Sequence, residues 1–118
     1  MAAKNDLLNT LLLSARRGSG GAKMLSAQQL QDLYEYAARQ SMIVDGIEAF
    51  KVTEKFDIPH VALTISASEL HESYASLSWE QRITAMKDVI MDLLQETKRI
   101  GGEFRFNAWV SLKEDWKS

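Results

Sequence analysis

The sequence predicts an α+β fold in which a small antiparallel or mixed three-stranded sheet packs against two to four helices. Two observations indicate this class. Apolar residues follow helical spacing in the first 40 residues and again over 78–101, and they alternate in the middle and at the end of the chain. The segments follow the order α-α-β-β-α-β. With 118 residues and no internal repeat, we expect a single domain over 1–118.

The first predicted helix runs from Asn5 to about Ala15. Leucines at positions 7, 8, 11 and 12 form one apolar stripe, and Gly18 ends the helix. The glycine-rich stretch 18–21 then predicts a flexible loop. Because Met24 is an alternative start, residues 1–23 are also interpreted as an N-terminal helical extension with a glycine-rich loop.

Two later helices carry clear start signals. Ser26 and Gln29 have the spacing of a capping box, which predicts a helix from there to about Gln40. Ser78 and Gln81 repeat the pattern and open a long helix that ends near 101. A further short helix is expected over 68–74.

Three segments read as strands. Residues 42–52 are rich in β-formers, and Gly46 within them indicates a bulge or a close approach of another segment. Asp57 and Pro59 mark a connection, after which residues 60–66 alternate between apolar and polar. The clearest alternation covers 103–112, where the apolar side is formed by Phe104, Phe106, Ala108 and Val110.

Charge is unevenly distributed along the chain. The net charge is −2, but residues 45–72 hold six carboxylates against two lysines, a local net charge of −4. Nucleic-acid-binding proteins usually have a raised isoelectric point, whereas here it is about 5.7. The acidic segment therefore indicates no nucleic acid partner. It favours either a basic protein partner or an acidic surface that only aids solubility.

Several functional classes lack the residues they need. There are no cysteines and two histidines, so we expect no metal and no cofactor. His71-Glu72 begins like a zinc-protease motif, but Ala75 stands where the second histidine ligand belongs. We therefore predict no catalytic residues and no enzyme, with a small hydrolytic enzyme using His60 and carboxylates as the weakest alternative. The N-terminus lacks a signal-peptide layout and no apolar run has membrane-spanning length, which predicts a cytoplasmic protein with no membrane partner.

The last strand places large side chains on its polar side. Arg105 and Trp109 project there, and a tryptophan beside mixed charge is typical of a protein interface. The alternative is that the N-terminal helix or the C-terminal tail covers Trp109. If the strands are neighbours, both residues have diagonal reach to Asp45 or Glu48. Asp45 and Glu48 would lie on opposite faces of a regular strand, and a bulge at Gly46 would bring them together.

The helix Leu33-Tyr34-Glu35-Tyr36-Ala37 followed by the strand 43–50, together with the closing strand 104–110, resembles small bacterial toxin-immunity proteins. These are the inhibitors of colicin-type and contact-dependent growth-inhibition toxins. The resemblance covers residues 25–112. It implies a cytoplasmic protein that binds and neutralises a cognate toxin domain, often a basic nuclease.

On this interpretation one set of residues contacts the toxin domain, with the tryptophan as an aromatic anchor: Asp45, Glu48, Asp57, Glu69, Glu72, Arg105 and Trp109. The alternative from another class is a self-associating or adaptor domain that uses an exposed sheet edge. The sequence is compatible with either a monomer or a homodimer.

Overall fold

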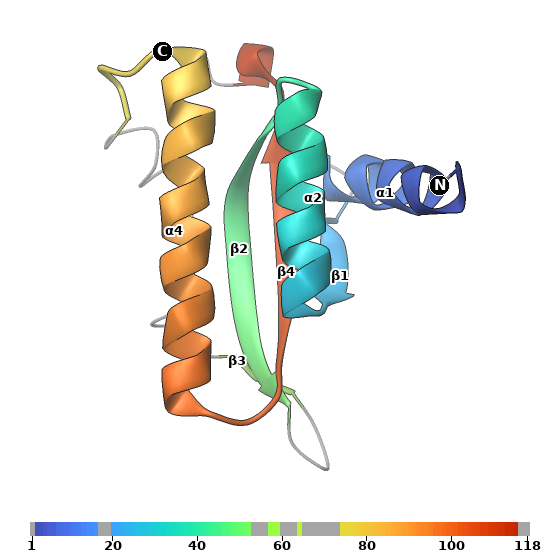
Figure 1. Ribbon diagram of the computed structural model, residues 1–118, viewed down its shortest axis with the longest axis vertical. Helices are drawn as coiled ribbons and strands as arrows, with labels where there is room; N and C mark the ends of the chain where they lie inside the picture. The colour runs from blue at the N-terminus through green and yellow to red at the C-terminus, as the bar shows by residue number, and fades with distance from the viewer. Residues whose placement is uncertain (1, 17–19, 53–56, 60–63, 65–73, 116–118) are drawn as a thin grey trace.

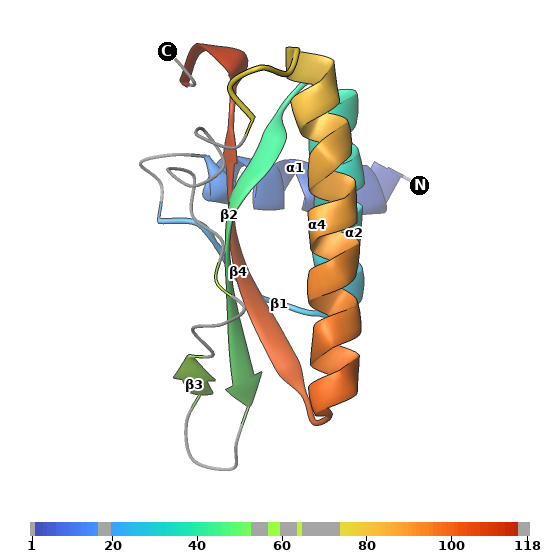
Figure 2. The same cartoon turned by 90° about the vertical axis from the view of Figure 1, so that its left-hand side faces the viewer.

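Helices α2 (Ala27–Arg39) and α4 (Trp79–Ile100) lie side by side over one face of an antiparallel sheet (Figure 1). The computed structural model describes residues 2–16, 20–52, 57–59, 64 and 74–115. Viewed along the sheet, both helices lie on the same side of it (Figure 2). One sheet face is therefore covered by helices, and the opposite face, called the outer face below, is not covered by α2 or α4.

The sheet has the strand order β1-β4-β2-β3. Its centre is the long pair β2 (Ile43–Val52) and β4 (Phe104–Ser111). The two flanking strands are short: β1 (Ala22–Leu25) has four residues and β3 (Asp57–Pro59) has three. The predicted α+β class and the order of the elements are confirmed, and β1 is an additional strand that the sequence pattern did not indicate.

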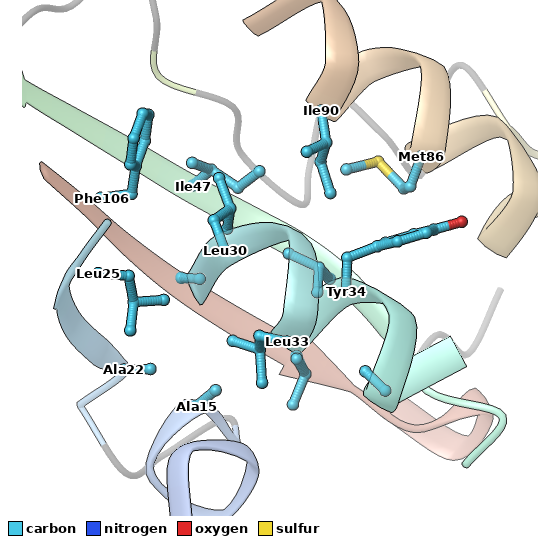
Figure 3. Close-up of a cluster of buried hydrophobic side chains, with 14 of the residues drawn as sticks. Ala15, Ala22, Leu25, Leu30, Leu33, Tyr34, Ile47, Met86, Ile90 and Phe106 are labelled. Atoms are coloured by element: carbon cyan, nitrogen blue, oxygen red, sulfur yellow. The ribbon is translucent and has the colours of Figure 1, made fainter. Parts of the chain in front are cut away.

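The core lies between the sheet and the two covering helices. The predicted apolar side of β4 is buried, and Phe106 belongs to one buried cluster with Leu30 of α2 and Ile90 of α4 (Figure 3). Each large apolar side chain removed from water contributes about 1.5–3 kcal/mol to folding. This shared cluster fixes both helices on the same sheet face.

Both predicted capping boxes are confirmed. Ser26 and Ser78 each accept a hydrogen bond from the backbone N–H three residues on, and the glutamine there accepts one from the serine N–H. The two helices are also tied together inside the core, where Tyr34 donates from its hydroxyl to the Ile83 carbonyl at 2.6 Å. Burial raises the pKa of Tyr34 above its ordinary value, and the charges of nearby acidic residues add to the shift.

Helix α1 (Ala2–Ala15) lies beside α2 and runs across its direction (Figure 1). It buries Leu8, Leu12 and Ala15, whereas Leu7 is 54% exposed and Leu13 is 69% exposed. The buried stripe of α1 is therefore narrower than the predicted apolar stripe, which included Leu7. Because Leu12 and Ala15 belong to the main core cluster, α1 packs as part of the domain.

The structure moves one predicted boundary. Asp57 and Pro59, expected in a connection, lie in β3, which pairs with the end of β2. Apart from Thr64, the predicted strand over 60–66 lies outside the described residues, and so does the predicted helix over 68–74 except for Tyr74. A single turn of 3₁₀ helix, η2 (Lys113–Asp115), follows β4. Among the helices described, even the 22-residue α4, none combines the length and apolarity needed to cross a bilayer.

Candidate functional site

The outer face is lined by the alternate residues of β4 that the core does not use. Arg105, Asn107 and Trp109 are half-buried there, between the buried residues of the core side. Their partners on β2 follow from the strand register. Glu48 lies opposite Asn107, and Phe50 lies opposite Arg105.

A β-bulge in β2 decides which residues share the outer face. The register shifts between Val44, which pairs with Val110, and Gly46, which pairs with Trp109. Two residues of β2 therefore oppose Trp109, and the extra residue is Asp45. The bulge predicted at Gly46 is confirmed, and it places Asp45 on the same face as Glu48.

Asp45 is not available to a partner at the surface. Its side chain is 1% exposed and accepts a hydrogen bond from the Ser111 hydroxyl at 2.6 Å. Ser111 is itself fully buried. A buried carboxylate needs such donors because leaving water is costly. The prediction that Asp45 contacts a toxin domain is therefore wrong, since the bulge turns this carboxylate into a buried hydrogen-bonding group.

Trp109 lies across two glycines that come from different parts of the chain. A Cβ atom on Gly21 would stand 2.6 Å from Cε2 and 2.7 Å from Nε1 of the indole. On Gly46 it would stand 3.4 Å from Cβ and Cε3 of the same tryptophan. The distances at Gly46 are ordinary van der Waals contact, so of the two alternatives predicted there the structure has the bulge. Trp109 is partly covered, and Gly21, which follows α1 in the chain, lies over one edge of its ring.

Asn107 connects β1 and β2 across β4. Its Oδ1 accepts a hydrogen bond from the Met24 N–H at 3.0 Å, and its Nδ2 lies 3.5 Å from Glu48 Oε1. Glu48 is half-buried and keeps part of its side chain at the surface. The outer face is thereby ordered by hydrogen bonds around Asn107, a residue that sequence reasoning assigned only to the polar side of the strand.

Arg105 pairs with a residue just before its own strand. Its Nε lies 3.4 Å from Glu103 Oε2, and the two side chains are 35% and 60% exposed. Exposed pairs of this kind contribute about 0–1 kcal/mol to stability. The diagonal reach predicted towards Asp45 or Glu48 is not used in this ion pair.

The side chains of the remaining predicted contact residues lie outside the part of the chain that the structure describes. Asp57 lies in β3, but its side chain is outside the description, and Glu69 and Glu72 are outside the described residues altogether. The same holds for His60 and His71. Of the seven predicted contact residues, the structure therefore places four on the outer face: Glu48, Arg105 and Trp109, which are partly exposed, and Asp45, which is buried.

A separate cleft lies at one end of the two-helix layer. It has a volume of about 940 Å³ and lies where the end of α2, the start of α4 and η2 meet. Its wall is fixed by Trp79, whose Nε1 donates to the Ser41 carbonyl at 2.8 Å. Its charged lining residues are Glu80, Arg82, Lys113 and Glu114. Sequence reasoning identified only the helix start at this place.

The outer face offers the partly exposed Glu48 carboxylate, one guanidinium, one amide and two aromatic rings in adjacent register. Over the part of the chain that the structure describes, no three His, Cys, Asp or Glu side chains gather in a way that would hold a metal ion.

The chain matches no known protein family, no curated protein and no solved structure. Its function is therefore argued from its own residues and geometry.

Proposed function

We propose that this chain is an inhibitor of the bacterial immunity type, which binds and neutralises a basic toxin domain through the outer face. The observation that carries the proposal is the β2–β4 register, which puts Glu48, Arg105 and Trp109 on the sheet face away from α2 and α4 (Figure 2). Phe50, directly opposite Arg105, adds a second half-buried aromatic ring. Aromatic and arginine side chains carry much of the binding energy in protein interfaces.

The charge of the chain supports a basic partner. Residues 45–72 have a net charge of −4. Within this segment, Glu48 lies on the outer face and is partly exposed there. Opposite charges on two proteins speed their association and help to exclude wrong partners. The resemblance of 25–112 to toxin-immunity proteins points to the same kind of partner.

The alternative function, a self-associating or adaptor domain that uses an exposed sheet edge, has less support in the described sheet. Its flanking strands have four and three residues, and short edge strands are one way in which proteins prevent unwanted strand pairing. The inhibitor proposal therefore uses the face of the sheet and not its edge.

The test uses the whole chain as bait in a lysate of the cells it comes from. A basic domain that is captured is then purified and expressed alone and together with the chain. The proposal expects that the domain alone stops growth and that co-expression restores it. Binding of the purified domain is next compared between the wild type, Glu48→Lys and Glu35→Lys.

Glu35→Lys is the matched control because it makes the same charge change at an exposed position of α2, on the helical side of the sheet. Glu48→Lys is expected to slow association by roughly tenfold at low salt, with a smaller effect at high salt. Glu35→Lys is expected to change the rate much less. Equal effects of the two variants would remove the outer face from the proposal, and a captured domain that is harmless would remove the inhibitor function.

A further inference from the structure

The N-terminal part of the chain pairs with the edge of β4 that faces away from β2. It does so at the two residues on either side of Trp109. Arg16, just after α1, forms a parallel bridge with Val110, whereas Ala22 of β1 pairs antiparallel with Ala108. The chain therefore reverses direction between these two attachments. Trp109 is the residue of β4 that lies between them.

The Trp109 indole fills the space at this reversal. Its Cε2, Nε1 and Cζ2 atoms lie against Gly21, where an added Cβ would come within 2.6–2.9 Å of them. Gly21 also has a φ of +92°, a conformation in which other residues are strained. The opposite edge of the indole, at Cε3, lies over Gly46 of β2. The ring thus joins the N-terminal segment to the centre of the sheet.

The attachment around this contact is short and strained. β1 has four residues and an irregular register, and its Met24 has a φ of +58° although it is not a glycine. Such a conformation costs about 1–3 kcal/mol and persists only where the surroundings enforce it. Here the Met24 N–H is held by the Asn107 side chain. Ala22 and Leu25 of this segment are buried in the core, so the weak point is local: a strained residue in a strand of four residues.

We propose that α1 and residues 20–25 form a strap that opens from β4 as one unit, with Trp109 as its fastening. α1 packs on α2 as well as on β1 and β4, so the loss of the β1 pairing removes one of its three supports. Opening exposes the indole and the edge of β4 at Phe106 and Ala108, while α2, α4 and the β2–β4 pair stay folded. The inference goes beyond the proposed function and does not depend on it.

Hydrogen–deuterium exchange of the full chain, followed by mass spectrometry of its peptides, tests the strap. In the wild type, α1 and β1 are expected to exchange with one common opening equilibrium, faster than α2 and α4. Gly21→Ala is expected to raise exchange in α1 and β1 together by tenfold or more. Gly20→Ala is the matched control, because Gly20 has nearly the same φ of +87° but no atom within 4 Å of an added Cβ. It is expected to raise exchange clearly less.

Trp109→Phe tests the same contact from the other side. Phenylalanine keeps the Cβ and the first ring atoms near Gly46 but lacks the Nε1 and Cζ2 edge that touches Gly21. It is expected to raise exchange in α1 and β1 and to leave α4 unchanged. The strap is overturned if α1 and β1 exchange independently, or if Gly20→Ala acts as strongly as Gly21→Ala. If Gly21→Ala does not fold, Trp109→Phe alone decides. The strap is then overturned when this variant leaves the hydrogen exchange of α1 and β1 unchanged.

Discussion

The Asp45 carboxylate accepts a hydrogen bond from the Ser111 hydroxyl at 2.6 Å, across the bulge of β2 and with both side chains buried. A carboxylate that loses such a donor in the interior retains the cost of leaving water without its compensation. The pair therefore stabilises the end of the β2–β4 ladder at which the bulge lies.

Ser111→Ala is expected to lower the free energy of unfolding by about 1–3 kcal/mol, because it leaves the buried Asp45 carboxylate with one donor fewer. Urea unfolding measures the change. Ser14→Ala, at an exposed position of α1, is the control and is expected to change it by less than about 0.5 kcal/mol. Equal stability of the two variants would show that the Asp45–Ser111 bond contributes nothing.

Tyr34→Phe removes the hydroxyl that links α2 to α4 through the Ile83 carbonyl. Because this carbonyl lies in the buried region between the helices, the loss is expected to cost about 1 kcal/mol of unfolding free energy. Tyr36→Phe is a close control, since the Tyr36 hydroxyl bonds the Asn9 side chain at the exposed surface. A loss in Tyr36→Phe as large as that in Tyr34→Phe would contradict the special role of the buried bond.

The raised pKa of Tyr34 predicts how stability changes in alkaline solution. Burial is the main cause, followed by the charges of Asp88 and Glu35, and the ordinary value is 10.0. The folded state then holds the phenolic proton more tightly than the unfolded state, so stability falls as the pH rises from about 10 through the folded pKa. Tyr74, whose pKa is also raised, contributes in the same direction.

Chemical denaturation at a series of pH values from 8 to 12 checks this expectation. Tyr34→Phe should lose less stability over the alkaline part of the range than the wild type, because it lacks the phenol that titrates. A steeper or equal alkaline loss in Tyr34→Phe would exclude Tyr34 as a source of the dependence.

Local signals in the sequence predicted much of this fold. The two capping boxes depend on residues three apart, and the alternation of β4 reflects a strand with one buried side, so both can be recognised without knowing the tertiary structure. β1 could not be recognised in this way. Its four residues have no clear period, and they pair with residues more than 80 positions away.

In the candidate site, too, local features could be predicted from the sequence, whereas features that depend on tertiary contacts could not. Gly46 indicated a bulge or a close approach, and the structure has the bulge. The burial of Asp45 did not follow, because it depends on the position of the extra residue within the bulge and on the Ser111 hydroxyl opposite. Coverage of Trp109 by the N-terminal helix was one predicted alternative, but the contact with Gly21 did not follow, since it joins a loop and a strand that only the β4 pairing brings together.

Two adjacent leucines of α1 test whether this helix is an integral part of the domain. Leu12 is 7% exposed and lies in the core cluster, whereas Leu13 is 69% exposed. Leu12→Ala is expected to lower the free energy of unfolding by about 2–3 kcal/mol, because it removes buried apolar surface and leaves a cavity. Leu13→Ala makes the same chemical change at a position with little to lose, and a change within about 0.5 kcal/mol is expected. Urea unfolding of both variants decides the matter, since a Leu12→Ala protein as stable as the wild type would mean that α1 contributes no packing energy to the domain.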